Sequence, residues 1–441
     1  MASPPVSERL ALDDLREIWP ILAPVDRVLG FRMLDSEGAD DFFLALAPLD
    51  QATILLGLPA GERRLWMRML APDDTADVLQ EVPTDQRRAL MELLDDPTRR
   101  EVTALLAYAE DAAGGLMSPR FARMRPDMTA DEAISYLRRQ ARTRLETLYY
   151  AYVLDAEQHL LGVVSFRDLF TAAPTALVRD VMETDVVTVP EDMDQEQVAR
   201  IIAQQDLVAV PVLDAERHMR GIVTIDDIVD VVQEEATEDV HKFGGLAALD
   251  APYMQTSLWT MIRARAVWLS VLFVGEMLTA SAMAHFEREI ARAVVLALFV
   301  PLIISSGGNS GSQAATLVIR AMALGEVKLR DWWRIMHREV TAGFSLGCVL
   351  ALLGLVRIVL WQALFHTYGP HYLRVAAAVS CSLVGVVTFG TLSGSMLPFV
   401  LRRLGFDPAS ASAPFVATLV DVTGLVIYFS TADLILSGTM L

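Results

Sequence analysis

One acidic residue, Asp421, lies near the middle of a long apolar stretch at residues 411–437. An ionised carboxylate at that depth in a membrane costs a few kcal/mol unless water, a cation or a partner group compensates it. The candidate spans contain few basic side chains that could pair with it, chiefly Arg320 and Arg357. We therefore predict that Asp421 contacts a transported cation, and that Ala417, one helical turn earlier, shares its face.

A second polar segment, GGNSGSQ, interrupts the apolar stretch PLIISSGGNSGSQAATLVIRAMALGE at residues 301–326. Backbone that departs from a helix at membrane depth is tolerated where protein buries it or where it lines a wet cavity. Close packing of helices through small residues would explain the glycines, but it would not explain Asn309 and Gln313. We predict that this segment breaks its helix and lines a pore, where Asn309 and Gln313 contact the water bound to the ion.

Other acidic residues could complete an ion path. Asp407 lies 14 residues before Asp421, which is roughly 21 Å along a continuous helix and nearly the same facing, so it would guard the inner mouth. Glu276 either lines the pore or hydrogen-bonds to a neighbouring helix, and Asp433 is better placed at the outer mouth or an interface. Magnesium keeps much of its water and is held by one or two carboxylates, so two copies of Asp421 from a dimer would suit it. The lack of a Cys and His ligand set argues against a filter for soft metals or zinc.

The elements that must position these residues are membrane-spanning helices. Apolar stretches long enough to cross a hydrocarbon core of about 30 Å follow residue 266, and they cover residues 267–284, 293–322, 341–365, 375–400 and 411–437. Lys and Arg gather before the first stretch, between the second and third, and before the fifth. This bias predicts a multi-pass protein of the cytoplasmic (inner) membrane with its N-terminal half in the cytoplasm and Leu441 outside. The N-terminal sequence lacks the pattern of a cleavable signal peptide.

Charge divides the chain in the same place. Residues 1–260 carry 47 acidic and 24 basic side chains, whereas the remainder carries 9 acidic and 13 basic ones. So acidic a first part argues against a nucleic-acid partner and favours cation binding or solubility. The two cysteines lie in apolar spans and form no disulfide framework. We find no nucleophile and base pair and no phosphate-binding loop, and we expect no enzymatic activity.

The N-terminal part contains an internal repeat. Residues 46–69 align without a gap on residues 70–93, and a fainter copy follows them. Pro punctuates short amphipathic runs in both copies, as expected for stacked helix pairs that bury their faces only against their neighbours. The repeat serves either as a scaffold or as part of a sensor.

A second duplication relates residues 117–137 to 182–202 and the segment GVVSFRDLF to GIVTIDDIV. Each copy is predicted to fold as strand, helix, strand, strand, helix, and the pattern resembles the CBS module, which occurs in tandem pairs. In that family the Ser or Thr and the Asp of the second segment can hold an adenine nucleotide such as ATP. The resemblance assigns this role to Ser165, Asp168, Thr224 and Asp227, while a purely structural pair stays equally open.

The order of the parts, with the segments YAEDAAGGLM, EEATEDVHKFGG, GGNSGSQAATLVIRA and PFVATLVDVTGL, resembles the MgtE family of magnesium channels and transporters over nearly the whole chain. The resemblance implies a homodimer with a pore on its two-fold axis, Asp421 in that pore, and cytoplasmic Mg²⁺ sites that close the gate. It implies regulatory metal ligands at Asp95, Asp214, Glu216, Asp226 and Asp250. The segment from Val240 to Thr260 is less acidic than is usual in the family, so a magnesium lock there would be weaker or built elsewhere.

The predicted fold is a multidomain α and α/β membrane protein. Its parts are a helical superhelical repeat domain at 1–116, CBS modules at 117–178 and 179–239, a connecting plug helix at 240–263, and a pore domain of five helices at 264–441. The predicted function is magnesium-selective transport through a dimeric pore gated by Mg²⁺. The alternatives are a broader carrier of divalent cations such as Co²⁺, Mn²⁺ or Ca²⁺, a CBS-gated anion channel, which Asp421 argues against, and a membrane-anchored sensor that transports nothing.

Overall fold

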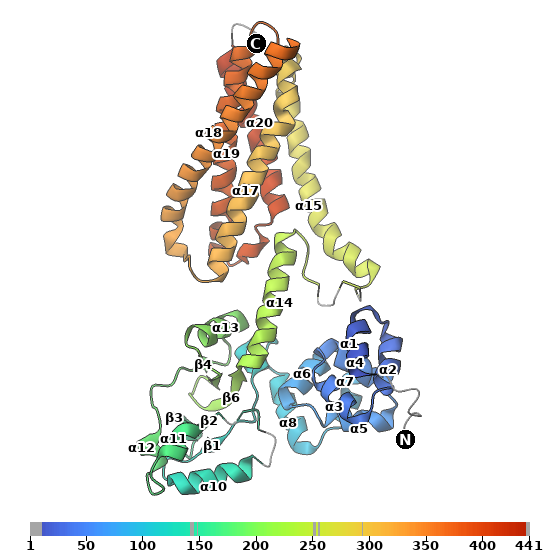
Figure 1. Ribbon diagram of the computed structural model, residues 1–441, viewed down its shortest axis with the longest axis vertical. Coiled ribbons are helices and arrows are strands. Elements are labelled where there is room, and N and C mark those ends of the chain that lie inside the picture. Colours follow the sequence, from blue (N-terminus) through green and yellow to red (C-terminus); the bar gives the residue numbers. More distant parts are fainter. Residues whose placement is uncertain are drawn as a thin grey trace. The chain divides into compact units, whose positions relative to one another are not determined.

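The computed structural model describes residues 11–141, 145–147, 149–249, 253, 254, 256–292 and 294–437. The chain divides into two compact units, Met1–Glu235 and Ala236–Leu441 (Figure 1). The first unit holds the helical repeat and both CBS modules, and the second holds the long apolar helices.

Short helices build the N-terminal part of the first unit. In chain order they are α1 (Leu12–Ile18), the 3₁₀ turn η2 (Trp19–Ile21), α2 (Pro24–Arg32), α3 (Ser36–Leu44), α4 (Pro48–Gly57), α5 (Ala60–Met67), α6 (Pro72–Glu81), α7 (Thr84–Met91) and α8 (Asp96–Leu105). The sequence repeat is thus a repeat of helix pairs, because α4 and α5 correspond to α6 and α7.

A repeated arginine fixes the turn inside each helix pair. Arg63 donates from Nε to the Leu58 carbonyl at 2.8 Å and from a terminal nitrogen to Leu56. Arg87, at the same place in the next copy, makes the matching bonds to Val82 and Gln80. These carbonyls end α4 and α6 and have no partner within their helices, so the guanidinium groups satisfy them.

Each CBS module contains a three-stranded sheet. The elements of the first module are β1 (Arg123–Met124), α10 (Ala130–Gln140), β2 (Tyr150–Leu154), β3 (Leu160–Ser165) and α11 (Phe166–Thr171). Those of the second are β4 (Val189–Pro190), α13 (Gln195–Gln204), β5 (Ala209–Leu213), β6 (Met219–Thr224) and α14 (Ile225–Phe243), and the short helices α9 (Ala113–Leu116) and α12 (Val178–Val181) precede the two modules. In both sheets the first strand is parallel to the central strand and the third is antiparallel to it.

The two modules exchange their leading segments across a pair of glycines. The Met182–Glu183 segment lies against Gly162 of β3, where an added Cβ would sit 2.6 Å from the Glu183 carbonyl oxygen. In the same way Met117 and Ser118 lie against Gly221 of β6, where an added Cβ would sit 2.7 Å from the Ser118 carbonyl oxygen. A side chain at either glycine would collide with this backbone, so the glycines are needed for the modules to pair.

The helical repeat and the second CBS module share one hydrophobic core. Its buried members include Leu79 and Val102 from the repeat and Val198, Ile202 and Val223 from the module. A side-chain bond between Tyr108 Oη and Glu191, at 2.8 Å, joins the same two parts. The placement of α6 beside the second module is therefore set by apolar burial, which is the dominant favourable term in folding.

The segment between the two parts of the chain differs from the single connecting helix predicted over 240–263. Helix α14 begins inside the residues predicted for the second CBS module and ends at Phe243. Residues 246–249 are irregular, and helix α15 (Leu258–His285) contains the end of the predicted segment. Gly244 and Gly245 follow α14, and the left-handed φ of 74° at Gly245 is the conformation that commonly ends a helix.

Among its described residues, the second unit contains five helices long and apolar enough to cross a membrane, as predicted. Its elements are α15, α16 (Glu287–Arg292), the 3₁₀ turns η3 (Val294–Phe299), η4 (Leu329–Asp331) and η5 (Pro408–Ser410), and the long helices α17 (Val300–Ala323), α18 (Trp332–Phe365), α19 (Tyr372–Arg403) and α20 (Ala413–Leu436). Figure 1 shows the long helices side by side, with α17, α18 and α20 packed on α19 and with α15 packed on α20.

The predicted break in the second span is wrong. Helix α17 runs without interruption through the segment GGNSGSQ. Its glycines instead allow close packing: a Cβ on Gly311 would lie 2.7 Å from Val416 Cγ1 and 2.8 Å from the Gly390 carbonyl oxygen. On α19, Gly390 lies against Gly307 and Gly394 lies against Gly311 in the same contact. Small residues that bring two backbones together are typical of helix pairs in membranes.

This packing predicts the effect of adding a single methyl group. Gly311→Ala forces Val416 or the α19 backbone to move, and overpacking of this kind costs roughly 1–3 kcal/mol, so the melting temperature in detergent should fall by several degrees. Gly308→Ala is the matched control, because its Cβ would meet Ala417 at an ordinary 3.6 Å. Equal melting temperatures for the two variants would contradict the proposed contact.

Candidate functional site

Asp421 is half-buried on α20, the last long helix. The helix starts where Ser412 Oγ accepts a hydrogen bond from Phe415 N and where Pro414 occupies the first turn. The carboxyl group of Glu276 on α15 lies within hydrogen-bonding reach of the Asp421 carboxyl group. Two acidic groups from different helices thus meet at one point, a juxtaposition that the sequence alone left open for Glu276.

The neighbouring helix α17 presents a polar face close to this point. Gly308 packs against Ala417, the residue one turn before Asp421. Asn309 and Gln313 are both exposed and lie four residues apart on the same face, and Asn309 Nδ2 donates to Ser305 Oγ at 3.4 Å. The structure therefore brings Asp421, Ala417 and the start of the polar segment together, although by helix packing and not by an unwound backbone.

Asp407 is already engaged within the second unit. Its Oδ1 accepts a bond from Ala409 N at 2.8 Å, which caps η5, and its Oδ2 pairs with Lys242 Nζ at 2.6 Å. Lys242, near the end of α14, also pairs with Glu238 one turn earlier. An ammonium group thus neutralises the carboxylate predicted at the inner mouth. The sequence offered no signal for this pair, whose members are 165 residues apart.

The predicted nucleotide residues lie at the starts of α11 and α14. Ser165 caps α11, where its Oγ accepts from Asp168 N at 3.1 Å and also bonds the Asp168 side chain. In the second module Thr224 Oγ1 donates to Asp227 at 2.7 Å. Hydrogen bonds of this kind stabilise a helix start without any ligand, so the motif has a structural role in both modules.

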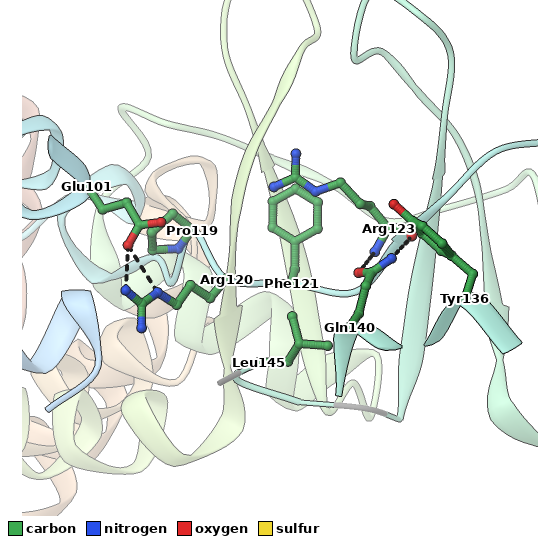
Figure 2. Close-up of a pocket in the computed structure, with 8 residues that line it drawn as sticks. All are labelled: Glu101, Pro119, Arg120, Phe121, Arg123, Tyr136, Gln140 and Leu145. Carbon is green, nitrogen blue, oxygen red and sulfur yellow. Dashed lines mark hydrogen bonds and ion pairs between the residues drawn. The ribbon is translucent and has the colours of Figure 1, made fainter. Parts of the chain in front are cut away.

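A separate cavity of about 490 Å³ lies beside the first module (Figure 2). Arg120, which lines the cavity, forms an ion pair with Glu101 of α8 at 2.8 Å. The Arg123 guanidinium lies over the Phe121 ring, 4.8 Å from its centre. The cavity is lined by Glu101, Pro119, Arg120, Phe121, Arg123, Tyr136, Gln140 and Leu145. It thus combines cationic and aromatic groups, and none of the four predicted nucleotide residues lines it.

Acidic side chains gather where α6 and the start of α14 meet, and we call this group the acid cluster. Its members interact electrostatically with one another: Asp73, Asp74, Asp77, Glu110, Glu146, Asp226, Asp227, Asp230 and Glu234. Both α6 and α14 carry two of these acids in the first turn, where the helix dipole favours negative charge. The dipole stabilises each pair of acids only at its own helix start, whereas the packing of the two helix starts brings like charges together.

Burial and repulsion raise pKa values within the acid cluster, at Asp73, Asp77 and Asp227 among others. Burial is the largest cause for Asp77, whose pKa rises to about 8, and for Asp227, whose pKa rises to about 7. Asp73 is only 6% exposed, and its Oδ1 has no hydrogen-bond partner among the described residues. Burial first, and then the charges of Glu146 and Asp74, raise the pKa of Asp73 well above its usual value. An unpartnered buried carboxylate oxygen is what a bound cation would satisfy, and oxygen ligands suit Mg²⁺.

The five predicted regulatory residues do not form one site. Asp226 belongs to the acid cluster. Asp95 instead caps α8, and its hydrogen bond from Thr98 lowers its pKa. Asp214 and Glu216 lie in the turn between β5 and β6, where Asp214 pairs with Arg220 at 2.7 Å. Asp250 lies outside the described residues. Most of the acid cluster has no local signal in the sequence, because its members become neighbours only when the repeat packs on the second module.

A polytopic membrane protein with a CBS pair and a repeat of short helices is the class that these features define. The family profile MgtE, described as a divalent cation transporter, matches residues 300–431. Profiles of the MgtE intracellular N domain and of the CBS domain match residues 10–111 and residues 113–174 and 178–234.

Curated relatives of the chain point to the same family. The chain is 46% identical to the magnesium transporter MgtE of Thermus thermophilus over 78% of its own length and 75% of that protein. It is 36% identical to the magnesium transporter MgtE of Enterococcus faecalis, over 76% and 71% of the two chains. The chain belongs to the MgtE family. A crystal structure of the cytosolic domain of the Mg²⁺ channel MgtE in complex with ATP is 41% identical, with a TM-score of 0.47, and covers 51% of this chain and 92% of that one.

The acid cluster predicts how stability depends on pH and on Mg²⁺. The raised pKa values mean that the folded state binds protons more tightly than the unfolded state, whose Asp pKa is about 4. Without metal, the stability of the full chain should therefore fall as pH rises from about 6 to about 8, and added Mg²⁺ should restore it. Thermal melting at several pH values, with and without Mg²⁺, measures this.

Removing two of the buried charges should weaken both effects. Asp73→Asn with Asp77→Asn should raise the metal-free melting temperature near pH 8 and reduce the shift caused by Mg²⁺. Asp85→Asn, on the exposed face of α7, is the control and should leave both quantities near those of the unmodified chain. A Mg²⁺ shift that survives in the double variant would exclude the acid cluster as the metal site.

Proposed function

We propose that this chain transports Mg²⁺ across the cytoplasmic membrane as a homodimer, with Asp421 in the ion path. The observation that carries the proposal is the half-buried carboxylate of Asp421, which lies in a membrane span beside Glu276 and next to the polar face of α17. Buried acids in membranes mark ion pathways, because the ion supplies the compensating charge. The magnesium transporters of the same family support the choice of ion.

The side chains at this point suit a hydrated ion. Magnesium sheds its water reluctantly, so its site needs carboxylates at the distance of a bound water and room for that water. Ala417 provides room because its side chain is small, and Asn309 and Gln313 provide amide groups that bond to water. No step requires covalent chemistry, so the proposed activity is transport and not catalysis.

The exposed polar face of α17 supports a second copy of the chain. Ser305, Asn309 and Gln313 are exposed on one face of a helix that the sequence places in the membrane. Amide groups facing lipid would lose their hydrogen bonds to water, at a cost that a polar partner or a wet pore removes. A two-fold pair of chains that meets along this face would enclose a polar path and would bring two copies of Asp421 to it.

We propose that Mg²⁺ in the acid cluster regulates the pathway from the cytoplasm. With the N-terminal unit in the cytoplasm and residue 441 outside, as the distribution of basic residues favours, the acid cluster would sample internal Mg²⁺. Cations there would neutralise the mutual repulsion of α6 and α14. The pair between Lys242 and Asp407 would then tie the end of α14 to the mouth of the pore.

ATP or a related nucleotide is the ligand that we propose for the cavity beside the first CBS module. The cavity volume of about 490 Å³ falls in the range of small-molecule sites. Arg123 and Arg120 could pair with phosphates, and Phe121 and Tyr136 offer aromatic faces for a base. Binding would compete with Glu101 for Arg120, which connects the module to α8.

Removal of the central carboxylate tests the transport proposal. Asp421→Ala should reduce Mg²⁺ flux at least about tenfold, as expected when ~1.4 kcal/mol or more of ion binding is lost. The measurement is flux into liposomes loaded with a magnesium-sensitive dye, at matched incorporation and low internal Mg²⁺. Asp433→Ala, 12 residues later on the same helix and exposed, is the control and should retain flux. Unchanged flux in Asp421→Ala would refute the assignment, and parallel assays with Co²⁺ and Mn²⁺ test the broader cation carrier.

Loss of regulation should leave the pathway itself intact. Asp226→Asn with Asp227→Asn removes two charges from the acid cluster, so flux at high internal Mg²⁺ should rise several-fold while flux at low internal Mg²⁺ stays the same. Asp192→Asn, an exposed acid of the same module, serves as the control. If the double variant closes at the same Mg²⁺ concentration as the unmodified chain, the regulatory role is wrong even though the pore assignment stands.

A further inference from the structure

Two hairpin turns, one in each CBS module, carry the same pattern of potential metal ligands. The first turn reads Asp-Ala-Glu-Gln-His at residues 155–159, between β2 and β3. The second reads Asp-Ala-Glu-Arg-His at residues 214–218, between β5 and β6. Both sets combine two carboxylates with one imidazole, which distinguishes them from the all-carboxylate acid cluster.

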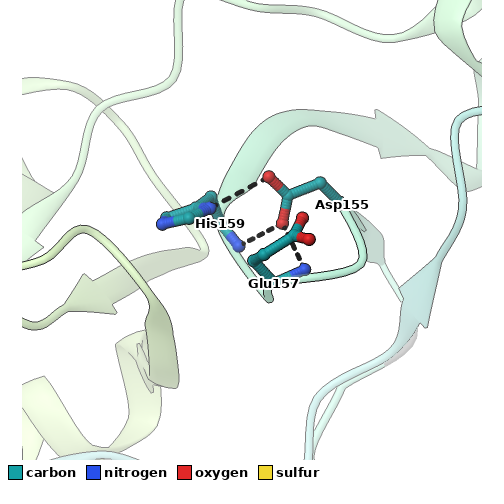
Figure 3. Close-up of side chains that lie close together, drawn as sticks. All are labelled: Asp155, Glu157 and His159. Carbon is teal, nitrogen blue, oxygen red and sulfur yellow. Dashed lines mark hydrogen bonds and ion pairs between the residues drawn. The ribbon is translucent and has the colours of Figure 1, made fainter.

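The backbone holds the ligands of the first turn on one side of the loop (Figure 3). Asp155 Oδ1 accepts bonds from the backbone N of Glu157 at 3.0 Å and of His159 at 2.8 Å. Its Oδ2 lies 2.9 Å from His159 Nδ1. One ligand atom from each of the three side chains lies within 4.8 Å of the other two.

Left-handed backbone closes both turns. Gln158 has a φ of 72° and Arg217 a φ of 70°, at the position just before each histidine. Glycine would adopt this conformation without strain, whereas a residue with a Cβ pays roughly 1–2 kcal/mol for it. The same unfavourable choice occurs twice, in turns that keep the same three ligand types.

The two turns lie against each other, but they are not equivalent. The imidazole rings of His159 and His218 stack with their centres 4.6 Å apart, and Met219 N donates to the Gln158 carbonyl at 3.0 Å. In the second turn Asp214 is buried and pairs with the Arg220 guanidinium, which occupies the carboxylate oxygen that also faces His218. In the first turn Asp155 has no such cation among the ion pairs of the described residues, and Glu157 is exposed. The first turn is therefore the one that can accept a metal ion.

We propose that Asp155, Glu157 and His159 form a binding site for a borderline divalent cation of the first transition series, such as Zn²⁺. In such a site Asp155 Oδ2 and His159 Nδ1 would both bind the ion. Zinc lies about 2.1 Å from carboxylate oxygen and imidazole nitrogen, so two ligands of a tetrahedral zinc stand roughly 3.4 Å apart. The two atoms are 2.9 Å apart in their hydrogen bond, so a small side-chain rotation brings them to the distance that a shared ion needs.

Charge and ligand type select this class of ion. Two carboxylates and a neutral imidazole neutralise a dication, and the imidazole favours zinc, nickel, cobalt or copper over magnesium. Slight desolvation raises the pKa of Asp155, but hydrogen bonds from the backbone and ring of His159 outweigh it and lower the pKa, so the carboxylate is ionised at neutral pH. Binding at Nδ1 requires the neutral ring with its one proton on Nε2, so protonation of the ring competes with the metal and the affinity should rise with pH. The site is independent of the transport proposal, because it shares no residue with the acid cluster or with the ion path.

A zinc titration of the full chain in detergent, in the presence of excess Mg²⁺, tests the proposal. Isothermal titration calorimetry should reveal one Zn²⁺ site per chain that Mg²⁺ does not occupy. His159→Ala should weaken it at least ~100-fold, since even the loss of a supporting contact around a metal can cost 10–100-fold. Gln158→Gly, which relieves the left-handed backbone and keeps every ligand, should bind Zn²⁺ within about threefold of the unmodified chain.

Matched variants decide between the two turns. His218→Ala should retain the site within about tenfold, because the second turn is occupied by Arg220. The proposal is overturned if the unmodified chain takes up no Zn²⁺ in excess Mg²⁺, if His159→Ala binds as well as the unmodified chain, or if only His218→Ala loses the ion. Circular dichroism of each variant confirms that the fold is intact, and Mg²⁺ flux reports separately on transport.

Discussion

The burial of negatively charged carboxylates is the physical constraint on which the rest of this structure depends. A carboxylate in a low-dielectric place needs a proton, a cation or a hydrogen-bond donor, and the chain leaves several such groups without a full set of these partners. Asp73 has a buried oxygen with no partner in the described structure, and Asp77 has a pKa of about 8. Asp421 and Glu276 bring two acids together at a membrane helix. Under the proposed function, bound cations would supply the missing partners, and proton or Mg²⁺ binding would shift the conformational equilibrium of the chain.

Much of the fold could be predicted from the sequence because its signals are local. The five spans follow from the length of apolar runs, and the helix pairs follow from a repeated Pro and Arg pattern that the bonds of Arg63 and Arg87 explain. The segment GGNSGSQ was harder, since glycine allows both a broken helix and close helix packing. The approach of Gly390 and Gly394 to α17 decides for packing. That approach depends on a helix some 80 residues later, which local sequence patterns do not report.

The candidate sites also differ in whether local sequence patterns predict them. Asp421 stands out in the sequence because a lone acid in an apolar run is unusual. Asp73 and Asp227, in contrast, look like ordinary surface acids. They become neighbours only through the core that the repeat and the second CBS module share. Duplication adds a further difficulty, because matching positions differ in surroundings. Asp168 is an exposed helix-cap partner, while its counterpart Asp227 has a pKa of about 7. Asp155 is accessible, while its counterpart Asp214 is paired with Arg220.

The most direct test of whether cations stabilise the contact between α6 and the start of α14 is amide hydrogen exchange in the full chain, compared with and without Mg²⁺. If Mg²⁺ satisfies the carboxylates between α6 and the start of α14, exchange should slow in both segments, while α1 and α2 at the far end of the repeat should be unaffected. Equal exchange in α6 and α14 under the two conditions, at a Mg²⁺ concentration that changes transport, would contradict the account.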